Sequence, residues 1–207
     1  MSDRYPELAA QLVDVAGSFY ARGWMLGTSG NLSAAVARDP VRLAITRSGV
    51  DKGRLSPAQI LEVDESGAVL RGDGKASDET SLHVEIVRRR AAGSVLHTHS
   101  VSSTILSLAH EKEGGIALEG FEMLKGLAGV ETHEHREWVP VLPNTQDYVR
   151  LVADIAATLD RHPQAHGLLL SGHGLYTWGR DVAEAKRHVE ILEFLLEVRR
   201  RLFAGRG

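Results

Sequence analysis

The 207-residue sequence contains no cysteine, and this single absence excludes several chemistries. The chain can form no disulfide framework, no thiolate metal site and no cysteine nucleophile. Any metal ion that it binds must therefore be held by nitrogen and oxygen ligands. A cysteine-free sequence also suits a reducing compartment, and we expect a cytoplasmic protein.

Long runs of one residue type are also missing. No stretch approaches the roughly 20 apolar residues of a membrane span, and the first residues lack the apolar region of a signal peptide. The net charge is only -3, and the arginine clusters at 88–90 and 199–201 are short. These features predict a soluble protein whose partners include neither nucleic acid nor a membrane.

The apolar pattern predicts alternating helices and short strands. Helical periodicity occupies residues 8–23, 80–92, 101–109, 146–159 and 182–203, and a short helix begins at 56–57. Strand-like runs occupy residues 32–36, 41–46, 61–63, 68–70, 94–97, 138–142, 168–170 and 175–178. Hairpin-linked strands mixed with helices favour a largely antiparallel or mixed sheet covered by helices. Because no repeat or linker divides the pattern, we expect a single α/β domain over residues 1–207.

Two histidines, His97 and His99, stand two residues apart at the end of an apolar strand-like run. Residues i and i+2 of a strand point to the same face, so both imidazoles can reach one metal ion. A catalytic zinc needs about three protein ligands and an open position. His173 lies between Gly172 and Gly174 and is the leading candidate for the third ligand, because flanking glycines let the backbone approach a ligand closely. A turn histidine without a ligand role is the alternative for His173.

A second pair of histidines, His133 and His135, has the same spacing in different surroundings. Glu131 and Glu134 accompany this pair, whereas apolar residues precede His97. Charged neighbours are typical of a loop or an edge. We therefore interpret His133 and His135 as solvated polar residues.

Two glutamates are candidates for acid–base chemistry. Glu79 stands at the start of the helix before the histidine strand, where the helix dipole favours a charged carboxylate. Glu122 stands in the apolar, glycine-bounded segment 120–126, where an unpaired charge is costly. The alternatives are an ordinary first-turn acid for Glu79 and a surface acid beside Lys125 for Glu122.

Three loops rich in glycine and hydroxyl side chains occur at residues 27–31, 46–49 and 75–77. Backbone amides, hydroxyls and an amide side chain in such loops can surround an anion such as phosphate. Ordinary turn chemistry explains each loop equally well. Because all three loops occur in a chain that also has a metal-site pattern, a phosphate subsite and ordinary turns are equally favoured interpretations.

Taken in order, these motifs resemble the class II aldolase/adducin family. The matching segments are residues 27–33, 45–49, 75–80, 97–99 and 172–174, which together extend over nearly the whole chain. The resemblance implies a three-layer α/β/α domain with a central, mostly antiparallel sheet. It also implies a homotetramer with active sites near subunit contacts. In such a site, His97, His99 and His173 hold one zinc ion per subunit.

Within the family, segments 121–126 and 139–147 look like the branch that dehydrates 5-methylthioribulose 1-phosphate in methionine salvage. The product of that reaction is 5-methylthio-2,3-dioxopentyl 1-phosphate. By this resemblance zinc polarises the substrate carbonyl, and Glu122 exchanges protons at the neighbouring carbons. Family aldolases place their acid where Glu79 stands, which leaves the role of Glu79 open. The implied phosphate contacts are Asn31, Thr46, Ser48, Gly49 and Ser77, with Lys125 as a further contact.

Two other functions compete with dehydration. A family aldolase or epimerase would act on another sugar phosphate of the fuculose, rhamnulose or ribulose type. A non-enzymatic adducin-like module would bind partners without a metal site. The presence of all three histidines and of Glu122 argues against the module. Fold and zinc alone do not separate a dehydratase from an aldolase.

Overall fold

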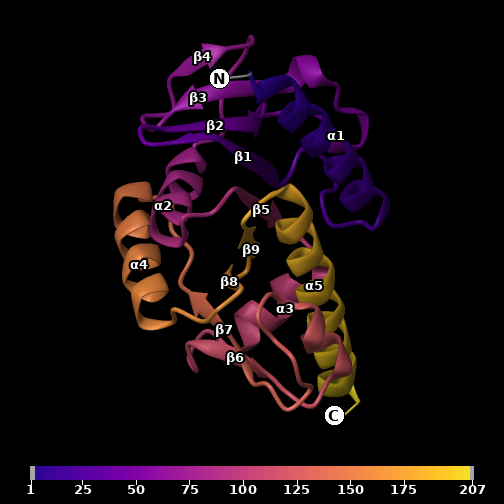
Figure 1. The fold of residues 1–207 in the computed structure, drawn as a ribbon. Helices are drawn as coiled ribbons and strands as arrows, with labels where there is room; N and C mark the ends of the chain where they lie inside the picture. The colour runs from indigo at the N-terminus through magenta and orange to yellow at the C-terminus, as the bar shows by residue number, and fades with distance from the viewer. Residues whose placement is uncertain (1–2, 206–207) are drawn as a thin grey trace.

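Short strands joined by tight turns, longer loops or helices assemble into one nine-stranded sheet in the computed structural model, which describes residues 3–205 (Figure 1). The strand order is β4-β3-β2-β1-β5-β9-β8-β7-β6, and every pair except β7 with β8 is antiparallel. The strands are β1 (Asn31–Arg38), β2 (Val41–Thr46), β3 (Ile60–Asp64), β4 (Val69–Arg71), β5 (Ser94–Thr98), β6 (Gly115–Leu118), β7 (Glu137–Leu142), β8 (Gly167–Leu170) and β9 (Gly174–Gly179).

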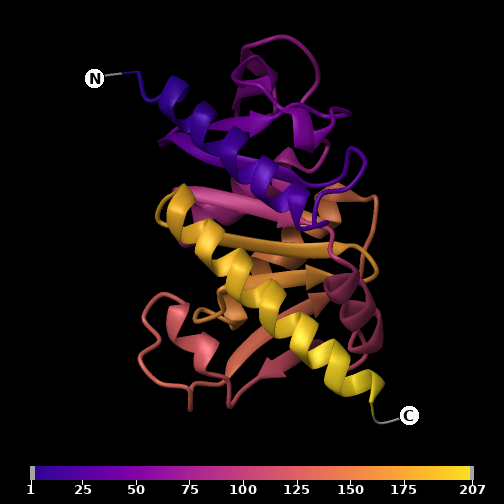
Figure 2. The ribbon, with the colours of Figure 1, turned by 90° about the vertical axis from the view of Figure 1, so that its right-hand side faces the viewer.

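Helices cover both faces of this sheet. The helices are α1 (Tyr5–Ala21), α2 (Thr80–Arg90), α3 (Val101–Ala109), α4 (Tyr148–Arg161) and α5 (Val182–Ala204), with short 3-10 turns η1 (Lys52–Arg54), η2 (Pro57–Gln59) and η3 (Glu122–Gly126). Helices α1 and α5 lie on one face and α2 and α4 on the other (Figures 1 and 2). The three-layer α/β/α architecture with a mostly antiparallel sheet is therefore confirmed. Within residues 3–205, no helix is both long and apolar enough to cross a bilayer.

Side-chain caps determine where three helices begin. Ser100, Asp147 and Asp181 each accept a hydrogen bond from the backbone N–H three residues later, at the first turns of α3, α4 and α5. The helix expected from residue 146 therefore starts at Tyr148, because Asp147 is its cap. The helix expected near residue 56 is only the single 3-10 turn η2. Strand β6 was not predicted, because four residues at a sheet edge carry little periodicity.

Strand direction decides which loops meet. Strands β5 and β8 are both antiparallel to β9, so their carboxyl ends lie at the same end of the sheet. Strand β7 is parallel to β8, and β6 is antiparallel to β7. The residues that follow β6 therefore lie at the other end of the sheet. In Figure 2, α3 marks the first end on the right, and η3 lies toward the left.

Candidate active site

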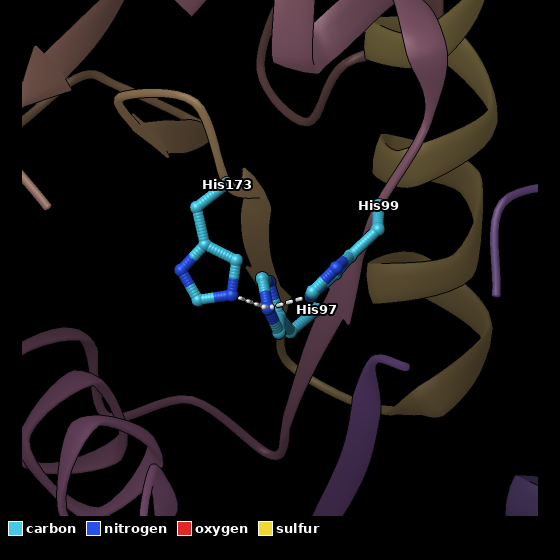
Figure 3. Close-up of side chains that lie close together, drawn as sticks. All are labelled: His97, His99 and His173. Atoms are coloured by element: carbon cyan, nitrogen blue, oxygen red, sulfur yellow. Dashed lines mark hydrogen bonds between the residues drawn. The ribbon is translucent and has the colours of Figure 1, made fainter. Parts of the chain in front are cut away.

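Three histidines converge at the carboxyl ends of β5 and β8 (Figure 3). His97 and His99 come from the end of β5, and His173 comes from the turn between β8 and β9. That turn requires glycine on both sides of His173. Gly172 has a φ of +63°, and a Cβ on Gly174 would collide with the carbonyl oxygen of Thr98. The flanking glycines therefore place His173 against β5.

The nitrogen atoms of the three rings are arranged for one shared ion. The Nε2 of His97 lies 2.7 Å from the Nε2 of His99 and 3.3 Å from the Nε2 of His173. Ligand nitrogens at about 2.0–2.1 Å from a tetrahedral metal lie roughly 3.3 Å apart. The Nδ1 of His97 donates to the carbonyl oxygen of Leu175 at 3.0 Å, which leaves Nε2 as the lone-pair nitrogen. Tyr176 stacks on the His97 ring, with 3.9 Å between ring centroids.

The protonation of these rings also fits metal binding. Burial, followed by the neighbouring imidazoles, holds the pKa of His97 well below its usual range. Burial lowers the pKa of His99 to about 4, with smaller contributions from His173 and Lys52. Neutral imidazoles are the form that binds zinc and similar ions. Burial also lowers the pKa of His173. The donor set is thus three imidazoles that favour the neutral form, with their ligand nitrogens within 4.8 Å of one another.

Glu79 lies directly against this cluster. Its Oε1 is 3.3 Å from the Nε2 of His173, and its Oε2 is 3.8 Å from the Nε2 of His97. The amide Nδ2 of Asn31 donates to Oε2 at 2.5 Å. The side chain of Glu79 is largely buried, so it is not an ordinary first-turn surface acid. The arrangement can hold a cation between imidazoles and a carboxylate, or exchange a proton beside it.

A cleft of about 180 Å³ opens next to the histidines. The predicted phosphate contacts among its lining residues are Asn31, Thr46, Ser48, Gly49 and Ser77. Arg47 and Lys52 also line the cleft, and neither was among the predicted site residues. Lys52 is almost fully buried, its Nζ donates to the carbonyl oxygens of Thr28 and Val50, and burial lowers its pKa to about 8. In the sequence, the only feature that could have indicated Lys52 was its position three residues after the glycine-containing loop 46–49.

Glu122 and Lys125 lie outside this cleft within their own chain. Glu122 is exposed, with 72% of its side-chain surface accessible, and Lys125 Nζ donates to its Oε1 at 2.7 Å. His133 Nδ1 lies 3.8 Å from the other carboxylate oxygen of Glu122. The sequence thus placed Glu122 in one site with the histidines. In the structure, Glu122 follows β6 and lies at the other end of the sheet. His133 is exposed as expected for a loop, whereas His135 contacts buried Glu137.

The family follows from a comparison with known proteins. Residues 10–199 match the family model described as "Class II Aldolase and Adducin N-terminal domain". The chain belongs to this family. Two similar curated proteins are methylthioribulose-1-phosphate dehydratases. The one from Methylococcus capsulatus is 47% identical over 94% of this chain and 93% of its own. The one from Acidiphilium cryptum is 48% identical over 91% of this chain and 87% of its own.

Solved structures show the same family fold. The L-fuculose-1-phosphate aldolase from Thermus thermophilus superposes with a TM-score of 0.76 at 27% identity, over 98% of this chain and 100% of the aldolase. YgbL from Klebsiella pneumoniae superposes with a TM-score of 0.78 at 26% identity, over 96% of this chain and 89% of its own. A protein described as an L-fuculose-1-phosphate aldolase therefore shares the architecture that places the three histidines together here.

Helix α5 contributes a buried carboxyl group behind the histidine strand of this family fold. Thr98 Oγ1 donates to Oε1 of Glu193 at 2.7 Å, and burial raises the pKa of Glu193 from 4.5 to about 7. Because the folded-state pKa lies above the unfolded value, ionisation of Glu193 costs stability as the pH rises from about 4.5 to about 7.

We expect Glu193→Gln to remove this cost. Above about pH 7.5 the variant should exceed the wild type in unfolding free energy by on the order of 2 kcal/mol. Near pH 5 the difference should be small, because Glu193 is then protonated in the folded state. Urea unfolding at both pH values measures the two differences. An equal difference at both pH values would contradict the role of ionisation.

Proposed function

We propose that this protein is a zinc-dependent methylthioribulose-1-phosphate dehydratase that acts in cytoplasmic methionine salvage. The observation that carries this assignment is the similarity at 47% identity, over 94% of the chain, to a curated protein of that name. The fold alone would not suffice, because an L-fuculose-1-phosphate aldolase shares it. The absence of cysteine supports a reducing compartment.

We place zinc on His97, His99 and His173, whose donor set and spacing suit it. Zinc supplies a Lewis acid that makes the hydrogen beside the substrate's carbonyl carbon acidic. The phosphate would enter the cleft lined by Arg47, Lys52 and the hydroxyl-rich loops. Buried Lys52 is held by two carbonyl oxygens, so its charge is positioned before substrate arrives.

We assign the acid–base role to Glu122 of a neighbouring copy in a homotetramer. Glu122 projects into solvent from its own chain, outside the cleft. Helix α3, which starts next to the histidines, exposes apolar Val101, Ile105 and Leu108. An exposed apolar face beside a site is typical of a protein contact. A neighbour that covers this face would bring its Glu122 to the cleft and complete the site.

The proton balance needs a base and an acid near the substrate's third and fourth carbons. Glu122 takes the proton from C3 and becomes a carboxylic acid, which then protonates the departing C4 hydroxyl so that it leaves as water. The resulting enol ketonises when C4 gains a proton and the C3 hydroxyl loses one. The hydrogen bond from Lys125, together with its charge, lowers the pKa of Glu122 and keeps it ionised as a base.

A sugar-phosphate aldolase is the second candidate, because Glu79 lies against the histidines, where family aldolases place their acid. The two activities separate when purified protein is incubated with methylthioribulose 1-phosphate and with fuculose 1-phosphate. We expect the diketone from the first substrate and no dihydroxyacetone phosphate from the second. Dihydroxyacetone phosphate without diketone would contradict the dehydratase assignment.

A further inference from the structure

A second group of histidines surrounds a buried carboxylate at the end of the sheet away from the candidate metal centre. Glu137, the first residue of β7, is 1% exposed. Its Oε2 lies 2.9 Å from the Nε2 of His135 and 3.0 Å from the Nδ1 of His166. Its Oε1 accepts the backbone N–H of His166 at 2.9 Å. Both oxygens of this carboxylate therefore have partners.

Two imidazoles of this group hydrogen-bond to the backbone of one residue between η3 and β7, Ala128. The backbone N–H of Ala128 donates to the Nε2 of His188 at 3.1 Å. The Nε2 of His166 lies 2.8 Å from the carbonyl oxygen of Ala128. His166 precedes β8 and His188 lies on α5, so the backbone of Ala128 is fastened on both sides to the core.

These contacts specify where the protons sit. Both nitrogens of His166 face acceptors, namely Glu137 and the Ala128 carbonyl, so both carry hydrogen and the ring is an imidazolium. The Nδ1 of His188 donates to the Trp178 carbonyl, and its Nε2 accepts, so this ring is neutral. Burial lowers the pKa of both rings, but the hydrogen bond and charge of Glu137 outweigh it for His166 and raise its pKa. The pKa of His188 falls to about 4.

We propose that Glu137, His166 and His188 form a clamp that positions the segment carrying Glu122. This segment comprises residues 119–136, between β6 and β7, and its five-residue turn η3 is its only helix. Ala128 lies six residues after Glu122, so a fixed Ala128 restricts where Glu122 can reach. The three clamp residues are positioning residues, and their importance for turnover rests on the proposed function of Glu122.

The clamp is complete over a limited pH range. Above the raised pKa of His166, the ring loses one proton, and either Glu137 or the Ala128 carbonyl loses its donor. Below the lowered pKa of Glu137, the carboxylate loses its charge. The other titratable or charged groups around the clamp are His135, Glu184, Arg187 and, along an adjoining cavity of about 270 Å³, Arg90 and Arg180. We therefore expect the segment to loosen as the pH rises through the pKa of His166.

The test combines hydrogen exchange with kinetics on the zinc-loaded protein. In His166→Gln the side chain is uncharged and its two N–H groups share one nitrogen, so it cannot place donors at both ring-nitrogen positions, and amide exchange in peptides covering residues 124–132 should rise at least about 10-fold. The kcat for methylthioribulose 1-phosphate should fall at least about 10-fold with little change in KM, because a displaced Glu122 affects the chemical step. The control His162→Gln replaces an imidazole at the end of α4 and should change neither quantity.

Unchanged exchange in His166→Gln would overturn the clamp, and raised exchange with unchanged kcat would overturn its role in positioning. If that variant does not fold, the clamp is tested instead by amide hydrogen exchange of the wild-type protein from about pH 6 to about pH 9. After correction for intrinsic rates, the 124–132 peptides should open as the pH rises, whereas β3 peptides should not. The same pH dependence of exchange in the 124–132 peptides and the β3 peptides would overturn the clamp. Absence of dehydratase activity in the wild type would instead contradict the proposed function, because exchange is measured without substrate.

Discussion

Glu122→Gln is expected to reduce dehydration of methylthioribulose 1-phosphate by roughly 1,000-fold without loss of bound metal. Glutamine keeps the shape of the side chain but cannot accept or donate the transferred proton, a step worth about 100-fold to 10,000-fold. Metal content should be unaffected, because the donor set is His97, His99 and His173 and does not include Glu122. Steady-state kinetics and metal analysis of the same preparation measure both effects. A fully active variant would remove Glu122 from the mechanism.

Mixed oligomers test whether Glu122 serves a neighbouring copy. Glu122→Gln and His99→Gln chains should each be inactive alone. In randomly mixed tetramers, about one quarter of the sites combine an intact histidine set with an intact glutamate from the next copy. Activity should therefore recover to about one quarter of the wild-type value. No recovery, in tetramers shown by mass spectrometry to be mixed, would show that Glu122 does not act in the site of a neighbouring copy.

Removal of the metal is expected to lower activity below about 1% of the loaded enzyme, with recovery on addition of zinc. The three imidazoles lie close together and neutral, so a bound ion also stabilises the folded state over the unfolded state. The thermal midpoint should therefore fall when a chelator removes the metal. Activity assays and thermal scans before and after zinc addition measure both effects.

The two His-x-His motifs provide matched variants for this experiment. His99→Gln should lose stoichiometric metal, whereas His133→Gln should retain it, because His133 lies in an exposed loop beside Glu122. Metal content by elemental analysis separates the two variants. Equal metal loss in both would contradict the assignment of the centre to His97, His99 and His173.

Local patterns predicted most of the elements because each depends on neighbours in sequence. The period of two placed His97 and His99 on one face, and it needed no knowledge of the fold. His173 was harder to place, because its approach to β5 depends on the antiparallel pairing of β9 with both β5 and β8. In the local sequence, that pairing was indicated by the glycines on either side of His173.

The remainder of the site depends on contacts that no local pattern contains. Lys52 lies in the cleft because carbonyl oxygens from two loops hold its ammonium group. His83 was also missed, although it is fully buried and hydrogen-bonds Ser33 and Asn31, whose amide contacts Glu79. Glu122 carries the opposite lesson. The sequence grouped it with the histidines, whereas one chain holds it away from their cleft. Under the proposed function, the missing information concerns a second copy.

Helix α5 contacts both the segment that carries Glu122 and the strand that carries the candidate metal-binding histidines, at two positions with a fixed spacing. His188 holds Ala128 and Glu193 holds Thr98, so the two anchors are five residues, or roughly 7.5 Å, apart along one axis. A residue inserted between them would turn one anchor by about 100° relative to the other. Between residues 188 and 193, insertions and deletions should be absent from functional relatives, even where the side chains vary.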